Sequence, residues 1–168
     1  MNQLLIDHRR SFNLAGFLAC VAFLAIAGYL QFVEGMEPCP LCIFQRVVFA
    51  VLALVLLAAG LHAPRGRAAR VYGVLSLVTA AAGLALAWRH VWLQSLPPDQ
   101  VPACGPGLGY MLDAFPLWDA LRMVLSGSGE CAEVDRFLGV SIAWWTLWTF
   151  LFGGIAAAVV NWPARRAR

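Results

Sequence analysis

Four long stretches without a charged residue constrain this chain more than any other feature. They run over Ser11–Val33, Val47–Leu61, Val71–Trp88 and Phe137–Ala164. A helix needs about 20 apolar residues to cross the hydrocarbon core of a bilayer. The second stretch reaches that length only if its span begins near Cys42 and includes Arg46. Because 61% of the residues are hydrophobic, 12% are charged and the mean hydropathy is +0.74, a soluble globular domain is excluded.

The sequence therefore predicts an all-α fold, a four-helix transmembrane bundle. Segments that cross lipid must be helical so that each backbone group is satisfied within its own segment. We expect one integral membrane domain over residues 1–168, with spans near 12–33, 42–62, 70–92 and 140–162. Two loops on the outer side, 34–41 and 95–139, connect these spans. The first span follows basic residues as a signal peptide would, but its length and the spans after it indicate an uncleaved anchor.

The distribution of charge predicts the orientation of the bundle. All 12 basic residues are arginine, and eight of them lie in the N-terminus, in the loop near residues 62–70, and in the C-terminus: Arg9, Arg10, Arg65, Arg67, Arg70, Arg165, Arg166 and Arg168. Of the 9 acidic residues, all but Asp7 fall on the other side. By the positive-inside rule both termini are cytoplasmic, with a short first and a long second periplasmic loop. The net charge of +3 reports this orientation and indicates no nucleic-acid partner.

Four of the five cysteines fall on the predicted periplasmic side. Cys39 and Cys42 form a Cys-Pro-Leu-Cys pair before the second span, and Cys104 and Cys131 share the long second loop. Disulfides persist outside the cytoplasm, so two thiol pairs at one face of a membrane indicate an electron relay. Cys20, in the middle of the first span, is interpreted as a small buried apolar residue.

The Cys-Pro-Leu-Cys pair stands at the predicted start of a helix. Unpaired backbone N–H groups and the helix dipole favour a thiolate there, and we expect Cys42 to be the better placed of the two sulfurs. A structural zinc site needs four ligands, whereas the second pair is separated by 26 residues with no histidine between them, so no metal site is predicted. A purely structural disulfide between Cys104 and Cys131, worth about 3–4 kcal/mol, remains open.

Arg46 follows Cys42 by four residues, which places both on one helical face, about one turn into the membrane. A guanidinium at that depth indicates a functional site, where it would hold a thiolate or donate to a ligand oxygen. The alternative is an arginine that extends to the lipid headgroups. On the third span, His90 and Gln94 lie one turn apart at the same outer end.

The long outer segment is rich in proline and glycine, which predicts a mostly irregular and mobile loop. Within it, Pro116 can start a short helix in which Leu117, Leu121, Val124 and Leu125 share one apolar face. That helix would lie in the membrane surface or pack on the bundle, and the sequence leaves both open.

The oxidation of thiols needs an electron acceptor. The chain contains no Gly-rich dinucleotide fingerprint, no haem attachment motif and no iron–sulfur spacing. An acceptor dissolved in the bilayer remains. A quinone fits, because its carbonyl oxygens would accept hydrogen bonds from Arg46 and His90.

Three segments of the chain resemble the bacterial disulfide bond formation protein B (DsbB) family. They are Pro38-Cys39-Pro40-Leu41-Cys42-Ile43-Phe44-Gln45-Arg46, Arg89-His90-Val91-Trp92-Leu93-Gln94, and Gly127 to Glu133 with the following Phe137-Leu138-Gly139. The resemblance implies a multi-pass protein of the bacterial inner membrane that acts as a quinone-dependent protein-thiol oxidase. Its cofactor would be ubiquinone or menaquinone from the membrane pool, and its partner a periplasmic thioredoxin-like disulfide donor similar to DsbA.

The resemblance also implies a role for each site residue. Cys104 and Cys131 would form the disulfide that oxidises the partner, with Cys104 as the sulfur joined to it. Cys131 would then exchange with Cys39, and Cys42, as thiolate, would pass the electrons to a quinone beside Arg46. His90 resembles the quinone-side histidine of the family, and Gln94 lies one turn from it.

Other functions remain compatible with the sequence. Within the same chemistry, the chain could be a paralogue dedicated to one substrate or a quinone reductase of the vitamin K epoxide reductase type, whose cysteine order matches less well. From another class, it could be a metal-binding membrane protein or an assembly factor with structural disulfides.

Overall fold

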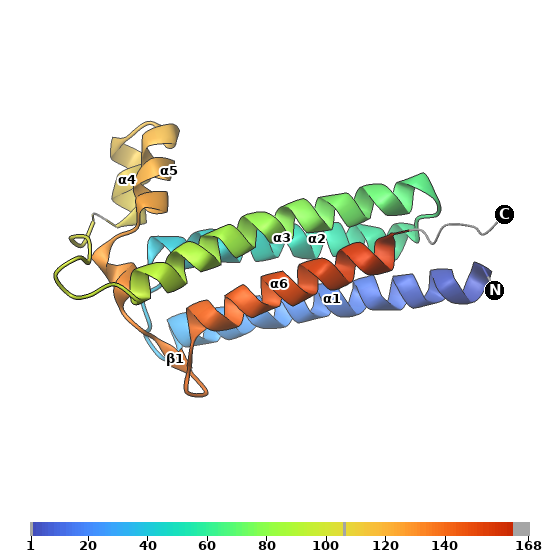
Figure 1. Cartoon of the computed structure of the whole chain (residues 1–168), viewed down its shortest axis with the longest axis horizontal. Helices are drawn as coiled ribbons and strands as arrows, with labels where there is room; N and C mark the ends of the chain where they lie inside the picture. Colours follow the sequence, from blue (N-terminus) through green and yellow to red (C-terminus); the bar gives the residue numbers. More distant parts are fainter. Residues whose placement is uncertain (1, 106, 163–168) are drawn as a thin grey trace.

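The four predicted spans form four long helices in the computed structural model, which describes residues 2–105 and 107–162. The helices are α1 (Asn2–Phe32), α2 (Pro40–His62), α3 (Arg67–Gln94) and α6 (Ile142–Asn161). They run side by side as one elongated bundle (Figure 1). All four are long and apolar enough to cross a membrane, α1 from His8 onward. The all-α, four-helix prediction is confirmed, and α2 begins at Pro40, two residues before the predicted start.

Small residues let the helices approach one another closely. The buried face of α3 contains Ala69, Gly73, Ser76, Ala80, Gly83 and Ala87, spaced by three or four residues. A Cβ atom on Gly83 would lie only 2.5 Å from the Phe150 ring, and Gly154 of α6 lies directly against Ala80. Lipid tails are as apolar as leucine, so close van der Waals packing, rather than the hydrophobic effect, holds such helices together.

A polar pair joins the first and last helices at one end of the bundle. The side-chain amides of Asn13 and Asn161 are fully buried and bond to each other in both directions, at 3.0 and 2.8 Å. Beside them, Arg9 donates to the backbone carbonyl of Trp162. The start of α1 and the end of α6 therefore lie together, at the end of the bundle that also carries the α2–α3 connection (Figure 1).

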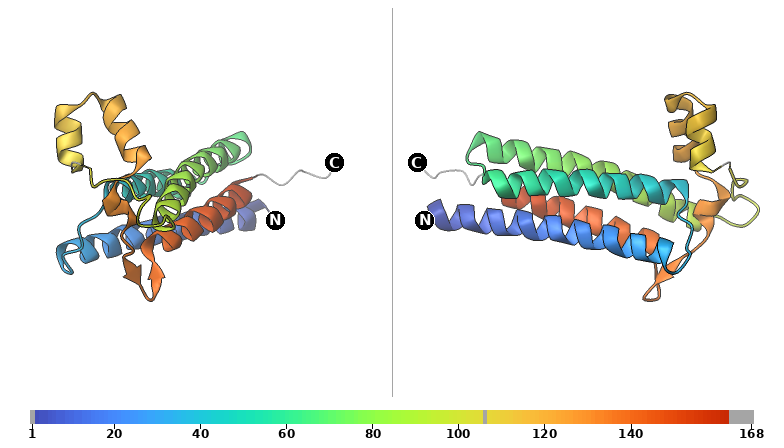
Figure 2. Two further views of the ribbon diagram at one scale, coloured as in Figure 1. Left: turned by 60° about the vertical axis from the view of Figure 1, so that its left-hand side comes forward. Right: turned by 180° about the vertical axis from the view of Figure 1, so that it is seen from behind.

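The long segment between α3 and α6 is more ordered than the sequence predicts. It contains helix α4 (Leu108–Ala114), helix α5 (Leu117–Ser126), a 3₁₀ turn η1 (Gly129–Ala132), and strands β1 (Arg136–Phe137) and β2 (Val140–Ser141). The strands pair antiparallel. Their two turn residues, Leu138 and Gly139, both have positive φ, the backbone conformation of a tight hairpin. Figure 2 shows α4 and α5 projecting from the end of the bundle opposite the N-terminus.

Helix α5 begins after Pro116, as predicted, and its apolar residues share one face, but the bundle covers only part of that face. Ala120 and Val124 are buried against the bundle end, whereas Leu117 and Leu125 are 75% and 44% exposed. Arg89 of α3 donates to the carbonyl oxygens of Leu125 and Ser126, and so binds the last turn of α5. Helix α5 therefore packs on the bundle through the middle of its apolar face and leaves the apolar side chains at its two ends exposed.

Candidate functional site

The first turn of α2 carries the Cys-Pro-Leu-Cys pair. Cys39 is the N-cap of the helix and Pro40 occupies its first turn, where a proline needs no hydrogen-bond donor. The Sγ of Cys39 accepts the backbone N–H of Cys42 at 3.3 Å, and the Cys39 thiol donates to Cys42 Sγ at 3.1 Å. The helix N–H group is thus aimed at Cys39, because Pro40 sets the helix start directly after Cys39. Cys42 is still the sulfur better placed to be a thiolate, as the sequence indicates, but the group that stabilises it is the thiol of Cys39.

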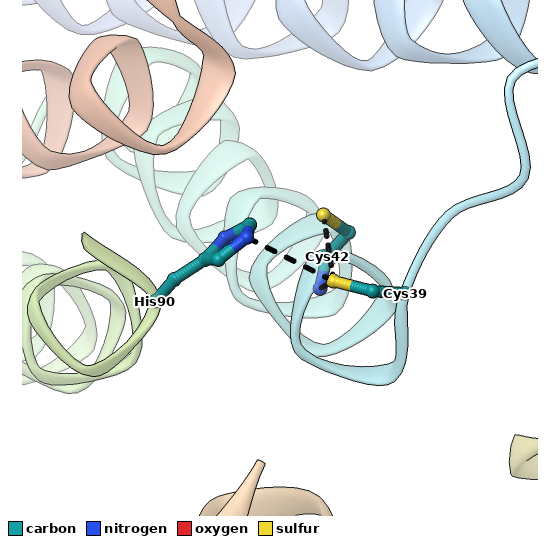
Figure 3. Close-up of side chains that lie close together, drawn as sticks. All are labelled: Cys39, Cys42 and His90. Carbon is teal, nitrogen blue, oxygen red and sulfur yellow. Dashed lines mark hydrogen bonds between the residues drawn. The ribbon is translucent and has the colours of Figure 1, made fainter. Parts of the chain in front are cut away.

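His90 approaches this pair from α3. Its side chain is buried, and its Nε2 lies 4.0 Å from Cys39 Sγ. Figure 3 shows the imidazole pointing from α3 toward the two sulfurs at the start of α2. On the other side of the ring, Nδ1 lies 3.4 Å from the amide nitrogen of Gln45. His90 is therefore held between the sulfur pair and a buried amide.

Gln94 connects His90 to the segment that follows Cys131. Its amide nitrogen lies 3.5 Å from His90 Nε2 and donates to the backbone carbonyl of Glu133 at 3.0 Å. Its amide oxygen accepts the hydroxyl of Ser141 at 2.6 Å. One side chain at the end of α3 thus holds both the η1 segment and the start of α6.

A cavity of about 340 Å³ opens beside the sulfur pair, between α1, α2, α6 and the β1–β2 hairpin. Its walls are mostly apolar and include Phe23 and Phe49, and its polar lining includes Cys42, Gln45 and Arg46. Cys42 and Arg46 therefore face one space, as their spacing predicts. Among the described residues, His90 and Gln94 lie outside the lining and approach the sulfur pair from α3.

The guanidinium of Arg46 is held by α1. It donates to the side-chain oxygen of Gln31 and to the backbone carbonyl of Ala27, the latter at 3.2 Å. Sequence reasoning missed Gln31. The feature that could have identified Gln31 is its position as a lone amide near the outer end of the first span, at the depth of Arg46 on the next helix.

Cys131 lies in η1 and is fully buried in the same cluster of side chains as Cys39, Leu41 and Leu93. Cys39 and Cys131 are close enough for each to alter the pKa of the other. The side chain of Cys39, followed by burial, raises the pKa of Cys131. Cys131 lowers the pKa of Cys39, but Cys42 and burial outweigh it and raise the pKa of Cys39 to about 12. Both sulfurs are therefore held mainly as thiols.

Cys104 has the opposite environment, because its side chain is exposed. It lies beside η1, where a Cβ atom on Gly129 would be 3.1 Å from Cys104 Sγ. The N–H of Gly129 also donates to the carbonyl of Ala103, which fixes the two segments side by side. The second cysteine pair thus has one exposed and one buried member, and the fifth cysteine, Cys20, is buried among apolar residues of the bundle.

Comparison with known proteins gives one family. The family model described as "Disulfide bond formation protein DsbB" matches residues 9–160. Proteins named "Disulfide bond formation protein B" are similar along most of their length. The protein from Nitrosococcus oceani is 56% identical over 141 residues, 83% of each chain. That from Hahella chejuensis is 53% identical over 150 residues, 89% of this chain and 90% of its own. That from Xanthomonas euvesicatoria is 44% identical over 169 residues, 99% and 98% of the two chains.

Proposed function

The chain belongs to the DsbB family of disulfide bond formation proteins, and from this premise we propose that it oxidises a periplasmic dithiol protein at the expense of a membrane quinone. It is a multi-pass membrane protein and an oxidoreductase of disulfide bond formation. The proposed partner is a thioredoxin-like disulfide donor similar to DsbA. The proposed acceptor is ubiquinone or menaquinone.

The order of the four sulfurs carries this proposal. Cys104 is exposed, Cys131 is buried against Cys39, and Cys42 lines the apolar cavity. These positions support a path from the aqueous surface to the cavity through Cys104, Cys131, Cys39 and Cys42, in that order. A purely structural disulfide between Cys104 and Cys131 would not explain why Cys131 also packs against Cys39 of the other cysteine pair.

In the proposed mechanism each step exchanges one disulfide bond for another. A thiolate of the partner attacks Cys104, the Cys104–Cys131 bond breaks, and Cys131 leaves as a thiolate. Cys131 then attacks Cys39, the Cys39–Cys42 bond breaks, and Cys42 leaves as a thiolate at the cavity wall. The second thiolate of the partner then forms the partner's own disulfide and releases Cys104 as a thiolate. Cys104 attacks Cys131, which re-forms the Cys104–Cys131 bond and frees Cys39. Two electrons have then moved from the partner to the Cys39–Cys42 pair.

The cavity beside Cys42 fits a quinone head group. Its volume is in the range of small-molecule sites, and such sites combine apolar walls with a few placed polar groups. Arg46 and Gln45 supply donors for carbonyl oxygens, and Gln31 orients Arg46. A quinone bound there would supply the acceptor of two electrons and two protons. We assign His90 and Gln94 to the sulfur side of the site, because they contact Cys39 and the Cys131 segment rather than this cavity.

The proposed orientation places the cysteines on the periplasmic side of the bacterial inner membrane and both termini in the cytoplasm. Five arginines support it, because Arg9, Arg10, Arg65, Arg67 and Arg70 belong to the end of the bundle opposite the cysteines. The three C-terminal arginines, Arg165, Arg166 and Arg168, lie outside the described residues. We propose that residues 1–168 form one integral membrane domain.

Disulfide mapping of the purified protein, with and without a short-chain ubiquinone, tests the proposal. The protein is mixed with a reduced thioredoxin-like donor whose second cysteine is replaced by serine, quenched with acid and analysed by mass spectrometry. We expect a mixed disulfide at Cys104 and a Cys39–Cys131 bond. The complex should persist in Cys20→Ser and be absent in Cys104→Ser. In a parallel assay the donor retains both cysteines, and oxidation of that donor no faster with the protein and quinone than without them would overturn the proposal.

A further inference from the structure

Two thiols and one imidazole meet at the start of α2. Cys39 and Cys42 come from the first turn of that helix, and His90 comes from α3, 51 residues beyond Cys39 in the sequence. The two sulfurs and the nearest imidazole nitrogen all lie within 4.8 Å of one another. Figure 3 shows the three side chains converging on one point between the two helices.

The spacing of these atoms suits a tetrahedral metal ion. Zinc binds thiolate sulfur at about 2.3 Å and imidazole nitrogen at about 2.0–2.1 Å, which separates two sulfurs by about 3.8 Å and a sulfur from a nitrogen by about 3.6 Å. The observed separations are 3.1 Å for the two sulfurs and 4.0 Å for Cys39 Sγ and His90 Nε2. Side-chain rotations that move the two sulfurs apart by about 0.7 Å and bring His90 Nε2 about 0.4 Å closer to Cys39 would give these coordination distances.

The charge balance also suits such an ion. Two thiolates cancel the charge of a divalent cation, so the complex adds no net charge to a buried site at the membrane boundary. The absence of added charge is important here, because a positive charge, the guanidinium of Arg46, already lines the cavity beside Cys42. Thiolate and imidazole ligands together favour Zn²⁺ and the softer Cd²⁺ over the hard cations Mg²⁺ and Ca²⁺.

Gln45 provides a partner for the other nitrogen of the imidazole. A metal-bound histidine donates its second N–H to an acceptor that fixes the ring and its tautomer. His90 Nδ1 lies 3.4 Å from the Gln45 amide. If the Gln45 amide group is rotated by 180°, its oxygen accepts Nδ1–H, and the lone pair of Nε2 is available to a metal once the long 3.5 Å contact with the Gln94 amide nitrogen is given up.

We propose that Cys39, Cys42 and His90 bind one soft divalent cation, Zn²⁺ or Cd²⁺, when the two cysteines are reduced. Binding releases the two thiol protons and transfers no electrons. These three ligands leave the fourth position of a tetrahedral ion for a water molecule or another small ligand. The Cys39–Cys42 disulfide cannot form while the metal holds both sulfurs, so, on the function proposed above, the cation is an inhibitor that acts on the reduced enzyme.

Cobalt is the optical probe for this site. The full-length protein in detergent is reduced with a phosphine, desalted without air and titrated with Co²⁺, then with Zn²⁺ and Cd²⁺. We expect one equivalent of Co²⁺ to give sulfur-to-cobalt charge-transfer absorption and the strong visible bands of tetrahedral coordination. Zn²⁺ and Cd²⁺ should displace it stoichiometrically, and the disulfide form should give neither band.

Matched variants decide which side chains bind. Cys39→Ser and Cys42→Ser should abolish the charge-transfer absorption of the site, and His90→Phe and Gln45→Leu should weaken binding by at least about 10-fold. Cys20→Ser and Cys104→Ser keep the three ligands and should bind as the wild type does. Circular dichroism establishes that each variant is folded. Equal binding in wild type and Cys39→Ser, or no binding at micromolar Co²⁺, would overturn the proposal.

The activity assay separates this inference from the proposed function. If both hold, Zn²⁺ inhibits quinone-linked thiol oxidation and a chelator restores it. If the protein oxidises no dithiol, the cobalt titration still decides the metal site. If it oxidises dithiols normally at saturating Zn²⁺ and binds no cobalt, only the metal proposal fails.

Discussion

Gln31 of α1 accepts a hydrogen bond from the guanidinium of Arg46 of α2, at the wall of the cavity that Cys42 also lines. A second bond, from Arg46 to the carbonyl of Ala27, fixes the guanidinium against the same helix. The position of the buried arginine is thus determined by the neighbouring helix as well as by its own. This arrangement gives the first prediction.

Gln31→Leu should raise the apparent KM for quinone about 10-fold with a smaller change in kcat, because the loss of a hydrogen bond to a charged group costs about 1.5–3 kcal/mol. Arg46→His should raise the KM further. Steady-state assays with a short-chain quinone measure both. Gln100→Leu, an exposed amide in the long outer segment, is the matched control and should leave the KM unchanged. A wild-type KM in both site variants would remove Arg46 from the quinone site.

Cys42→Ser should abolish quinone reduction while Cys104 still reacts with the partner, because Cys42 is the sulfur of the relay that lines the cavity. Absorbance of the quinone reports the first activity, and gel mobility of the trapped mixed disulfide reports the second. Cys20→Ser, also a change of one sulfur to oxygen, should retain both activities. Quinone reduction at the wild-type rate by Cys42→Ser would contradict the proposed order of the cysteines.

Gln94→Leu should slow the exchange between Cys131 and Cys39 about 10-fold without affecting attack at Cys104. Gln94 bonds to the Glu133 carbonyl and to Ser141, and these contacts hold the segment of Cys131 to the end of α3. Acid-quenched time courses, resolved by mass spectrometry, separate the two exchanges. Equal rates in Gln94→Leu and wild type would mean that burial of Cys131 alone positions it.

Asn13→Leu should lower the free energy of unfolding by about 1–3 kcal/mol, because it leaves the buried amide of Asn161 without its partner. The double variant Asn13→Leu with Asn161→Leu should lose less than the sum of the two single variants, since the two residues interact directly. Unfolding in mixed detergent micelles measures these differences. Additive losses would show that the two amides do not stabilise each other.

Gly83→Ala should destabilise the bundle by about 1–3 kcal/mol, because its Cβ would lie 2.5 Å from the Phe150 ring. Gly28→Ala, in α1, is the control, since a Cβ there meets nothing within 4 Å. That change should be neutral or stabilising by up to about 1 kcal/mol. The same unfolding assay applies, and equal effects at the two positions would contradict the helix packing.

Much of the fold follows from local sequence. The spans are visible because hydropathy over about 20 residues reports lipid contact directly. The start of α5 follows from Pro116, because a proline cannot donate a backbone hydrogen bond in a helix and therefore stands at its beginning. The same rule applies to Pro40, although hydropathy alone predicted a start of α2 two residues later. Helix α4 and the β1–β2 hairpin were missed, because the glycines and prolines around them indicate turns without specifying which short elements lie between the turns.

The sequence by itself determined the membrane bundle, its four helices, and the chemistry available to its cysteines, since these depend on residue type and spacing along one chain. Only the tertiary structure decided which sulfurs meet and what His90 faces. Cys131 reaches Cys39, and His90 reaches the same pair, through contacts between elements far apart in sequence. Such contacts depend on how the helices rotate and pack against one another. Small residues such as Gly83 and Ala80 control that packing. The spacing of the cysteines along the chain carries no information about it.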